Sequence, residues 1–295
     1  MTPPDILCIG SALWDIIGRA PATMRIGSDV PGRITRLPGG VAMNIAMTLR
    51  RFDLVPALLS AVGRDAEGEE LMATCRDLGV ITDFVYRSDD LPTDRYMAVE
   101  GGNGLIAAIA DAHSLEAAGD KILRALADGR LGRDAAPYGG MIALDGNLTA
   151  QLLAQIARSP LFCAADLRIA PASPGKAERL LGLLGHPRAT LYVNLEEAGL
   201  LMQSRFEDAQ AAAAALHDRG AHRVIVTNGG AEVAEAGPNG PLTACPPAVL
   251  VRRVTGAGDT FTAGHMAAER AGAAPDEALA RALRAAAAHV SGDIA

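Results

Sequence analysis

The turn at residues 253–259, Arg-Val-Thr-Gly-Ala-Gly-Asp, carries the residue types in this chain that are best suited to chemistry. Small and apolar residues follow it, so the turn is predicted to open a helix with Asp259 in its first turn. Free N–H groups at the start of a helix attract phosphate, whereas a carboxylate repels it. Asp259 in that place predicts a base that deprotonates an attacking hydroxyl beside a bound phosphoryl group.

Further polar groups lie where they could hold the molecule that carries this hydroxyl. Asp15 follows the first predicted strand, residues 6–9, and a carboxylate near the carboxyl end of a parallel strand can accept hydrogen bonds from two sugar hydroxyls. Gly39 and Gly40 precede a predicted helix and would let a ligand approach the backbone, with Asn44 in the early turns. A turn-capping aspartate and a connecting Gly-Gly turn are the alternatives, and spacing alone does not separate them.

Asn194 and Glu197 follow another predicted strand, residues 191–193. Their spacing is typical of a capping box at the start of a helix. The functional alternative places Glu197 near a phosphate-bound Mg²⁺, which it would hold through water. Thr227 and Gly229 follow the next strand and belong either to a simple turn or to one wall of a nucleotide pocket.

The elements that must position these residues alternate between strand and helix, which predicts an α/β fold with a parallel sheet covered on both faces. Short apolar runs typical of buried strands occupy residues 6–9, 58–62, 141–144, 162–165, 191–193 and 224–227. Segments with helical spacing occupy residues 42–51, 68–78, 150–158, 177–184, 209–219 and 275–289. In such sheets, ligands gather at the carboxyl ends of the strands.

Two segments interrupt the alternation. Residues 16–37 contain scattered Gly, Pro and Arg with short β-like pieces, and residues 95–110 are predicted to form a hairpin with its turn at residues 101–104. We interpret both as a small β-sheet lid, with surface hairpins of no catalytic role as the alternative. The resulting division assigns residues 1–15, 38–91 and 112–295 to a main domain and residues 16–37 and 92–111 to the lid.

The composition excludes several classes of protein. The 295 residues are 49% apolar, enough for a sizeable core, and the formal net charge of −7 argues against a nucleic-acid polymer or an anionic membrane as partner. No glycine-rich loop ends in Lys-Ser or Lys-Thr, so a Walker-type phosphate loop is not expected. The four cysteines and six histidines lack metal-binding spacing, and neither a signal peptide nor a membrane span is expected. A cytoplasmic protein is the expectation.

These motifs occur in a familiar order, because the chain resembles the ribokinase-like, or PfkB, family of carbohydrate and nucleoside kinases over nearly its whole length. The resemblance implies a three-layer α/β/α domain with a mostly parallel central sheet and a small β-sheet lid. It also implies an ATP-dependent transfer of phosphate to an alcohol. Four ordered motifs carry it: Gly39-Gly40 with Asn44, residues 61–68, Asn194 with Glu197, and residues 255–259.

The resemblance implies a role for each motif. Asp259 would be the catalytic base, and the backbone N–H groups of Gly256, Ala257 and Gly258 would form an anion hole for the transferred phosphoryl group. The sugar would be held by Asp15, Gly39, Gly40 and Asn44. The ATP phosphates, their Mg²⁺ and the nucleotide pocket would be served by Asn194, Glu197, Thr227 and Gly229.

Within the family, the chain is most similar to the pseudouridine kinases. The Gly-Gly-Val-x-x-Asn-Ile-Ala segment that ends at residue 46 and the lid residues 96–98 and 104–111 carry this likeness. It implies phosphorylation of the primary hydroxyl of a ribose-containing substrate, above all pseudouridine, with Thr93 and Tyr96 contacting ribose or uracil. Ribose, fructose or adenosine as acceptor, and a catalytically silent nucleoside-binding protein, are the alternatives.

Two features depart from the family pattern. Many members carry Asp at the position of Arg253, and the resemblance implies that this acid helps hold an activating monovalent cation. Arg253 argues against a K⁺ requirement. The alternative is that main-chain carbonyl oxygens bind the ion in place of the acid. The chain also ends at Ala295, soon after the predicted helix 275–289, so we expect this side to be trimmed or reduced. Free edges of the lid strands favour a homodimer through the lid.

Overall fold

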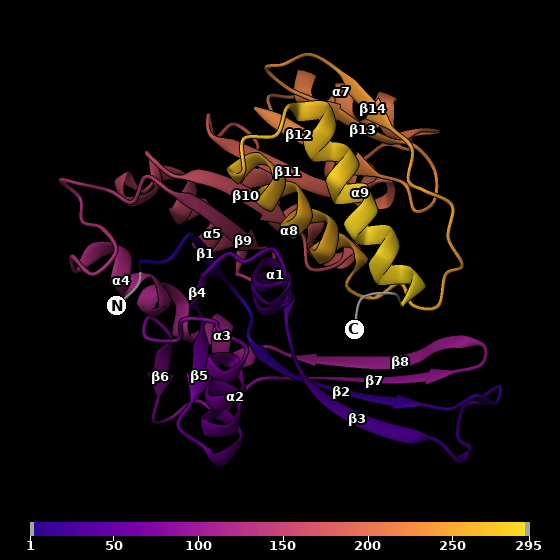
Figure 1. The fold of residues 1–295 in the computed structure, drawn as a ribbon. Helices are drawn as coiled ribbons and strands as arrows, with labels where there is room; N and C mark the ends of the chain where they lie inside the picture. The colour runs from indigo at the N-terminus through magenta and orange to yellow at the C-terminus, as the bar shows by residue number, and fades with distance from the viewer. Residues whose placement is uncertain (1–2, 293–295) are drawn as a thin grey trace.

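The structure, a computed structural model, describes residues 3–292 (Figure 1). Expectations that concern residues 1–2 and Ala295 lie outside the described residues. The central sheet has eight strands within the described part of the chain. They are β1 (Ile6–Ile9), β4 (Pro56–Leu59), β9 (Met141–Asp145), β10 (Asp166–Ala170), β11 (Ala189–Asn194), β12 (Arg223–Thr227), β13 (Val233–Ala236) and β14 (Leu242–Ala244).

The sheet is mostly parallel, as predicted. Its strand order is β14-β13-β12-β11-β10-β9-β1-β4, and every pair from β12 to β4 is parallel. Only β13 and β14 are added in antiparallel fashion at one edge. The residues of β1 show how both faces are covered, because Leu7 and Ile9 pack into one apolar cluster while Ile6 and Cys8 pack into another.

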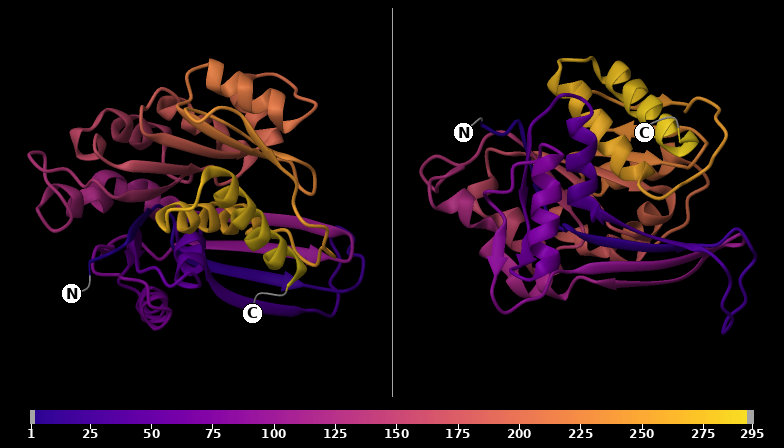
Figure 2. Two further views of the ribbon diagram at one scale, coloured as in Figure 1. Left: turned by 45° about the horizontal axis from the view of Figure 1, so that its top comes forward. Right: turned by 60° about the horizontal axis from the view of Figure 1, so that its bottom comes forward.

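Helices form a layer on each face of the sheet (Figures 1 and 2). One face packs against α1 (Val41–Arg50), α8 (Ala257–Arg270) and α9 (Pro275–Ser291), with α2 (Ala66–Asp77) beside them. The other packs against α3 (His113–Ala118), α5 (Ala150–Arg158), the 3₁₀ helix η3 (Pro174–Leu183), α6 (Leu195–Met202) and α7 (Ala209–Asp218). The predicted three-layer α/β/α arrangement is confirmed.

A second sheet of four strands projects from this body (Figures 1 and 2). Its order is β3-β2-β7-β8, and the predicted hairpin of β7 and β8 is confirmed, with Gly101 paired to Gly104 at its turn. The strands also include segments that the sequence analysis assigned to the main domain. Their bounds are Leu13–Arg19 (β2), Arg33–Gly39 (β3), Arg95–Gly101 (β7) and Gly104–Asp111 (β8).

Several predicted elements were wrong or displaced. Residues 162–165 are not a strand: the 3₁₀ turn Pro160–Phe162 leads to β10, which begins only at Asp166. Strand β10 was not predicted because its charged residues Asp166 and Arg168 interrupt the apolar pattern. The predicted strand 58–62 is divided at Ser60: β4 joins the central sheet, whereas β5 (Ala61–Gly63) pairs with β6 (Tyr86–Ser88). Residues 177–183 of the predicted helix 177–184 belong to the 3₁₀ helix η3, and the helices α3 and α4 (Arg124–Ala127) were not predicted.

Candidate active site

Polar residues gather at the end of the central sheet that is formed by the carboxyl ends of its parallel strands. β9 ends at Asp145, β11 ends at Asn194 and β12 ends at Thr227, and the last two are partners in the parallel register. β1 leads through a tight turn to Ser11, beside Asp145. Because the carboxyl ends of parallel strands lie at the same end of the sheet, these side chains are where ligands of α/β sheets bind.

Helix α8 begins with the glycine-rich turn, and Asp259 lies in its first turn, partly buried. The N-cap is Gly256, whose φ of 84° is a left-handed conformation that favours glycine. The N–H group of Ala257 donates to the Val254 carbonyl oxygen at 3.0 Å, so it is already used inside the turn. Within residues 3–292, the N–H groups of Gly256 and Gly258 have no partner and remain available to an anion.

Helix α1 brings the predicted sugar-binding motif to Asp259. Gly40 is its N-cap, with φ 93°, and a Cβ atom there would lie 2.6 Å from the carbonyl oxygen of Ser11, so the turn requires glycine. Asn44 follows one turn into the helix, and its Nδ2 donates a hydrogen bond of 2.8 Å to Oδ2 of Asp259. Two motifs at opposite ends of the chain therefore form one site.

The electrostatics of this site suit a base. Burial raises the pKa of Asp259 to about 7, the hydrogen bond from Asn44 acts in the opposite direction, and the charges of Asp145, Asp15 and Glu197 add to the rise. A carboxylate that titrates near neutral pH can accept a proton efficiently at that pH. Two of these three carboxylates, Asp15 and Glu197, are residues that the sequence predicted for the site.

Asp15 is paired with Tyr96 beside the glycine motif. The two residues are partners in the parallel register of β2 and β7. A Cβ atom at Gly39 would overlap the Asp15 carboxylate, so the absence of a side chain leaves room for it. Burial raises the pKa of Asp15 to about 6, and burial together with the Asp15 charge raises the pKa of Tyr96. A carboxylate and a phenol thus lie side by side on the second sheet.

Thr93, by contrast, has its polar groups engaged elsewhere. It is 3% exposed, and its hydroxyl and N–H donate to the two carboxylate oxygens of Asp65 at 2.5 and 2.8 Å. Asp65 is the N-cap of α2 and also accepts a hydrogen bond from Gly68. The structure therefore gives Thr93 a place in the support of α2, while Tyr96 lies beside Asp15 in the register of β2 and β7.

The capping box of Asn194 and Glu197 is confirmed. Asn194 Oδ1 accepts the N–H of Glu197, and Glu197 Oε2 accepts the N–H of Asn194, both at 2.8 Å. Glu197 is 6% exposed, and burial raises its pKa to about 7. Within residues 3–292, Oε1 of Glu197 has no hydrogen-bond partner, so the box leaves one oxygen for a ligand. Thr227 lies beside Asn194, and Gly229, with φ 56°, is exposed in the turn beyond it.

A metal ion at this site would bind through carboxylate oxygens of the protein together with the phosphates of a bound substrate. Among the described residues 3–292, no group of three or more His, Cys, Asp or Glu side chains could hold a metal ion alone. Mg²⁺ usually keeps several waters and binds through one or two carboxylates together with substrate phosphates. The free oxygen of Glu197 and the neighbouring carboxylates fit that manner of binding.

Further polar residues, which were not predicted, lie next to this end of the sheet. Asp145 is 1% exposed and accepts hydrogen bonds from the N–H and the hydroxyl of Ser11 at 2.8 and 2.5 Å. The Ser11 hydroxyl in turn accepts the N–H of Val41 at the start of α1. Asn147 accepts a hydrogen bond of 2.6 Å from Lys176. The Asp-Gly-Asn sequence directly after the predicted strand was the available signal.

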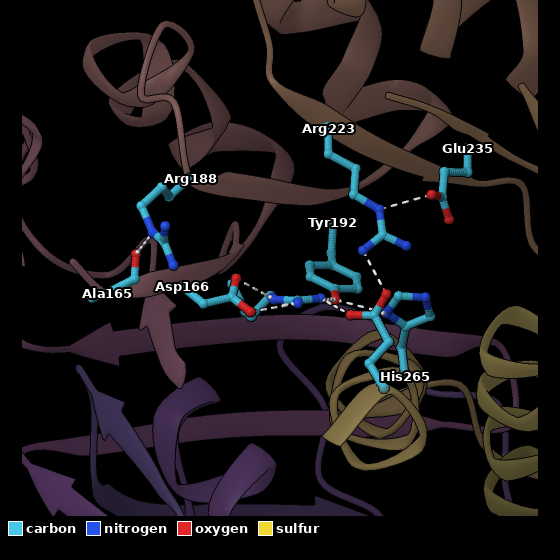
Figure 3. Close-up of polar contacts among 9 residues, drawn as sticks. Ala165, Asp166, Arg188, Tyr192, Arg223, Glu235 and His265 are labelled. Carbon is cyan, nitrogen blue, oxygen red and sulfur yellow. Dashed lines mark hydrogen bonds and ion pairs between the residues drawn. The ribbon is translucent and has the colours of Figure 1, made fainter. Parts of the chain in front are cut away.

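Buried charges hold α8 against the sheet (Figure 3). Glu269, in the last turn of the helix, accepts hydrogen bonds from Arg168 of β10 and Arg223 of β12, the latter at 2.6 Å. Arg168 also pairs with Asp166 at 2.6 Å, and Arg223 pairs with Glu235 at 2.7 Å (Figure 3). Every carboxylate of the network has an arginine partner, so the position of α8, and with it the first turn of the helix, is set by the sheet.

Several known proteins are similar to this chain in sequence and in fold. A family model described as pfkB family carbohydrate kinase matches residues 3–293. A pseudouridine kinase of Escherichia coli (strain K12) is 30% identical in an alignment of 282 residues that covers 88% of this chain and 82% of that protein. A solved structure of a carbohydrate kinase from Agrobacterium tumefaciens has a TM-score of 0.81 at 28% identity, covering 98% of this chain and 92% of that one.

The fold is also that of an Arabidopsis thaliana ribokinase solved with ribose and ATP, with a TM-score of 0.78 at 23% identity over 97% of this chain and 92% of that one. Among the residues that the structure describes, no helix is long and apolar enough to cross a membrane. Both the family model and the relative from E. coli extend over most of the sequence. The chain therefore belongs to the pfkB family of carbohydrate kinases and is a phosphotransferase that acts on an alcohol group.

Proposed function

We propose that this protein is an ATP-dependent kinase that phosphorylates the primary hydroxyl of a ribose-containing substrate, with pseudouridine as the foremost acceptor. The observation that carries the proposal is the position of Asp259, in the first turn of α8, 2.8 Å from Asn44 and with a pKa of about 7. A base, two free N–H groups and a sugar-binding motif thereby meet at one place.

In the proposed reaction, the acceptor hydroxyl gives its proton to Asp259 while its oxygen forms a bond to the γ-phosphorus of ATP. The bond from phosphorus to the bridging oxygen breaks, and ADP leaves with that electron pair. The N–H groups of Gly256 and Gly258 stabilise charge on the transferred phosphoryl group. Asp15 and Asn44 orient the sugar, because a carboxylate accepts and an amide donates hydrogen bonds to hydroxyls.

The nucleotide would lie on the side of the site formed by β11 and β12. Asn194 and Glu197 would organise the phosphates, and Thr227 and Gly229 would line the nucleotide pocket. Mg²⁺, when bound with ATP, neutralises charge on the β- and γ-phosphate oxygens. The free oxygen of Glu197 would hold this ion through water, which agrees with its single free position in the capping box.

Two observations support pseudouridine over other acceptors. The relative from E. coli that is 30% identical is a pseudouridine kinase. Asp15 and Tyr96 are register partners, so a carboxylate suited to ribose hydroxyls lies beside a phenol suited to stacking or hydrogen bonding with a base. Ribose, fructose and adenosine remain the alternative acceptors on the same scaffold.

We further propose that residues 16–37 and 92–111, which form most of the second sheet, are a lid that closes over the sugar. We also propose that this sheet pairs with the same sheet of a second copy of the chain. Ile34, Met97 and Ile109 lie on one face of it and are 80%, 47% and 62% exposed. Its outer strands β3 and β8 have free edges. Ile109→Asp is expected to convert a dimer to a monomer in light scattering, and a wild-type monomer would contradict this.

Release of ADP with pseudouridine, uridine, adenosine, ribose and fructose tests the proposed function. Pseudouridine should give the highest kcat/KM. Asp259→Asn should lower kcat by about 10²- to 10⁴-fold with ATP binding and melting temperature preserved. Retention of more than about a tenth of the activity would refute the assignment of the base. Nucleoside binding in calorimetry with no ADP from any acceptor would favour the catalytically silent alternative.

A further inference from the structure

The turn that opens α8 is tied to the end of α9 by side chains that the proposed reaction does not use. The connection from β14 to α8 passes the C-terminal end of α9 (Figure 1). The N–H groups of Arg252 and Arg253 both donate to the Val290 carbonyl oxygen, at 2.8 and 3.2 Å. Arg253 Nε donates to the His289 carbonyl oxygen at 2.9 Å, and His289 Nε2 lies 2.8 Å from the carbonyl oxygen of Thr255.

These contacts determine which nitrogen of His289 carries the proton. A carbonyl oxygen only accepts hydrogen bonds, so Nε2 must donate to Thr255. Nδ1 is then an acceptor, and it faces a terminal nitrogen of Arg253 at 3.4 Å. Burial lowers the pKa of His289, the bond to Thr255 raises it, and the charges of Arg253 and Arg51 lower it further. The ring is therefore neutral at neutral pH, with one donor and one acceptor both engaged.

His289 also supports the catalytic turn by direct contact. A Cβ atom at Gly256 would lie 3.2 Å from Nε2 of His289, so the imidazole packs against the N-cap of α8. Gly256 and Gly258 carry the N–H groups that face the phosphoryl group in the proposed function. A shift of the ring would move those N–H groups, and the rate of an electrostatically assisted transfer depends steeply on their position.

This arrangement does not fit the monovalent cation that the resemblance implies. Such an ion needs several oxygen ligands, typically backbone carbonyls. Here the carbonyl oxygens of Thr255 and His289 already accept hydrogen bonds from His289 and Arg253. The Arg253 guanidinium adds a positive charge at the same place, which would repel a cation. The chain itself thus supplies the hydrogen-bond donors, Arg253 and His289, that occupy the carbonyl oxygens a cation would need.

We infer that Arg253 and His289 are positioning residues that take the place of a monovalent cation, and that the enzyme does not require K⁺. The inference rests on the proposed kinase function. A guanidinium and an imidazole hold the turn at residues 255–259, and a soluble ion is not needed to neutralise its carbonyl oxygens.

The first experiment compares the wild-type protein in KCl, NaCl and choline chloride at one ionic strength of about 0.15 M. The initial rate of ADP release and the melting temperature should be the same in the three salts. A rate in KCl about fivefold or more above that in choline chloride would overturn the inference.

The second experiment removes the guanidinium. Arg253→Gln should lower kcat about tenfold with little change in KM, whereas Arg252→Gln, its matched control, should leave both unchanged. Guanidinium at about 10 mM, far below denaturing concentrations, should restore much of the lost rate in Arg253→Gln. An undiminished rate, or a loss that guanidinium does not restore, would contradict the replacement of the ion by the side chain.

The third experiment removes the imidazole. His289→Gln should lower kcat about tenfold with KM preserved, and His222→Gln, a histidine outside the site, serves as control. An equal rate in both variants would overturn the role of His289. If no acceptor yields ADP, the proposed function fails by itself. Melting temperatures still test the inference then, because K⁺ should raise that of Arg253→Gln and leave that of the wild type unchanged.

Discussion

The side-chain amide of Asn44 lies 2.8 Å from the Asp259 carboxylate, although 215 residues separate them in the chain. Asn44 is one turn into α1, Asp259 is in the first turn of α8, and the two helices pack against each other on the same face of the sheet. The base and the sugar-binding motif are therefore joined in the folded protein itself. Such preorganisation reduces what the substrate must order on binding.

The activity should rise with pH through neutrality and then level off. Burial raises the pKa of Asp259 to about 7, so the group is protonated and inactive as a base below that pH and ionised above it. A profile of kcat/KM against pH measures this, with a midpoint near 7 that belongs jointly to Asp259 and the coupled Glu197. A flat profile between about pH 5.5 and 8.5 would be inconsistent with a carboxylate base in this environment.

Variants of Asn44 should move that midpoint upward. The amide donates a hydrogen bond to the ionised form of Asp259, and its loss in Asn44→Ala removes a stabilisation of the charge. Asn44→Asp adds a like charge and should shift the midpoint further than Asn44→Ala. Both should lower kcat/KM by about tenfold or more, since the sugar contact is lost as well. An unchanged midpoint in both variants would mean that Asp259 does not govern the profile.

Gly40→Ala should disturb the start of α1. Gly40 has φ 93°, and a Cβ atom would meet the Ser11 carbonyl oxygen at 2.6 Å, so the change combines backbone strain with overlap. We expect a loss of about 2–4 kcal/mol in the free energy of unfolding and a raised KM for the acceptor. Gly27→Ala is the matched control, because φ is 81° there but nothing lies within 4 Å of the added atom. Equal losses in urea titrations would show that overlap at Gly40 is unimportant.

Glu269→Gln should destabilise the protein. The carboxylate accepts hydrogen bonds from two buried arginines, and its neutralisation leaves Arg168 and Arg223 with one carboxylate partner each (Figure 3). Loss of a buried ion-pair partner is strongly unfavourable, so we expect about 3 kcal/mol in urea unfolding at pH 7. Burial raises the pKa of Glu269, but its arginine partners lower it further, so the folded protein keeps this carboxylate ionised down to acidic pH. The difference between the variant and the wild type should therefore shrink only at acidic pH, where wild-type Glu269 is protonated as well. Glu277→Gln, which changes a partly exposed side chain on the solvent side of α9, should have no resolvable effect, and a comparable loss there would refute the explanation.

Local signals in the sequence predicted local structure well. The capping box of Asn194 and Glu197 and the hairpin turn at Gly101 and Gly104 depend on residues a few positions apart, and both are confirmed. Strand β10 was missed for the opposite reason. Its Arg168 is stabilised in the core by Glu269, which is 101 residues away, and a charged residue without its distant partner has the pattern of a loop.

By itself, the sequence determined the family, the parallel α/β architecture and the order of the motifs, because these follow from hydrophobic spacing and from contiguous signatures. Only the tertiary structure decided which partner each polar group meets: Thr93 meets Asp65, Arg253 meets His289, and Asn44 meets Asp259. Hydrogen bonds and pKa values depend on the distances to groups from remote segments and on the exclusion of water. Spacing along the chain records neither of these, so the chemistry of the site follows from packing.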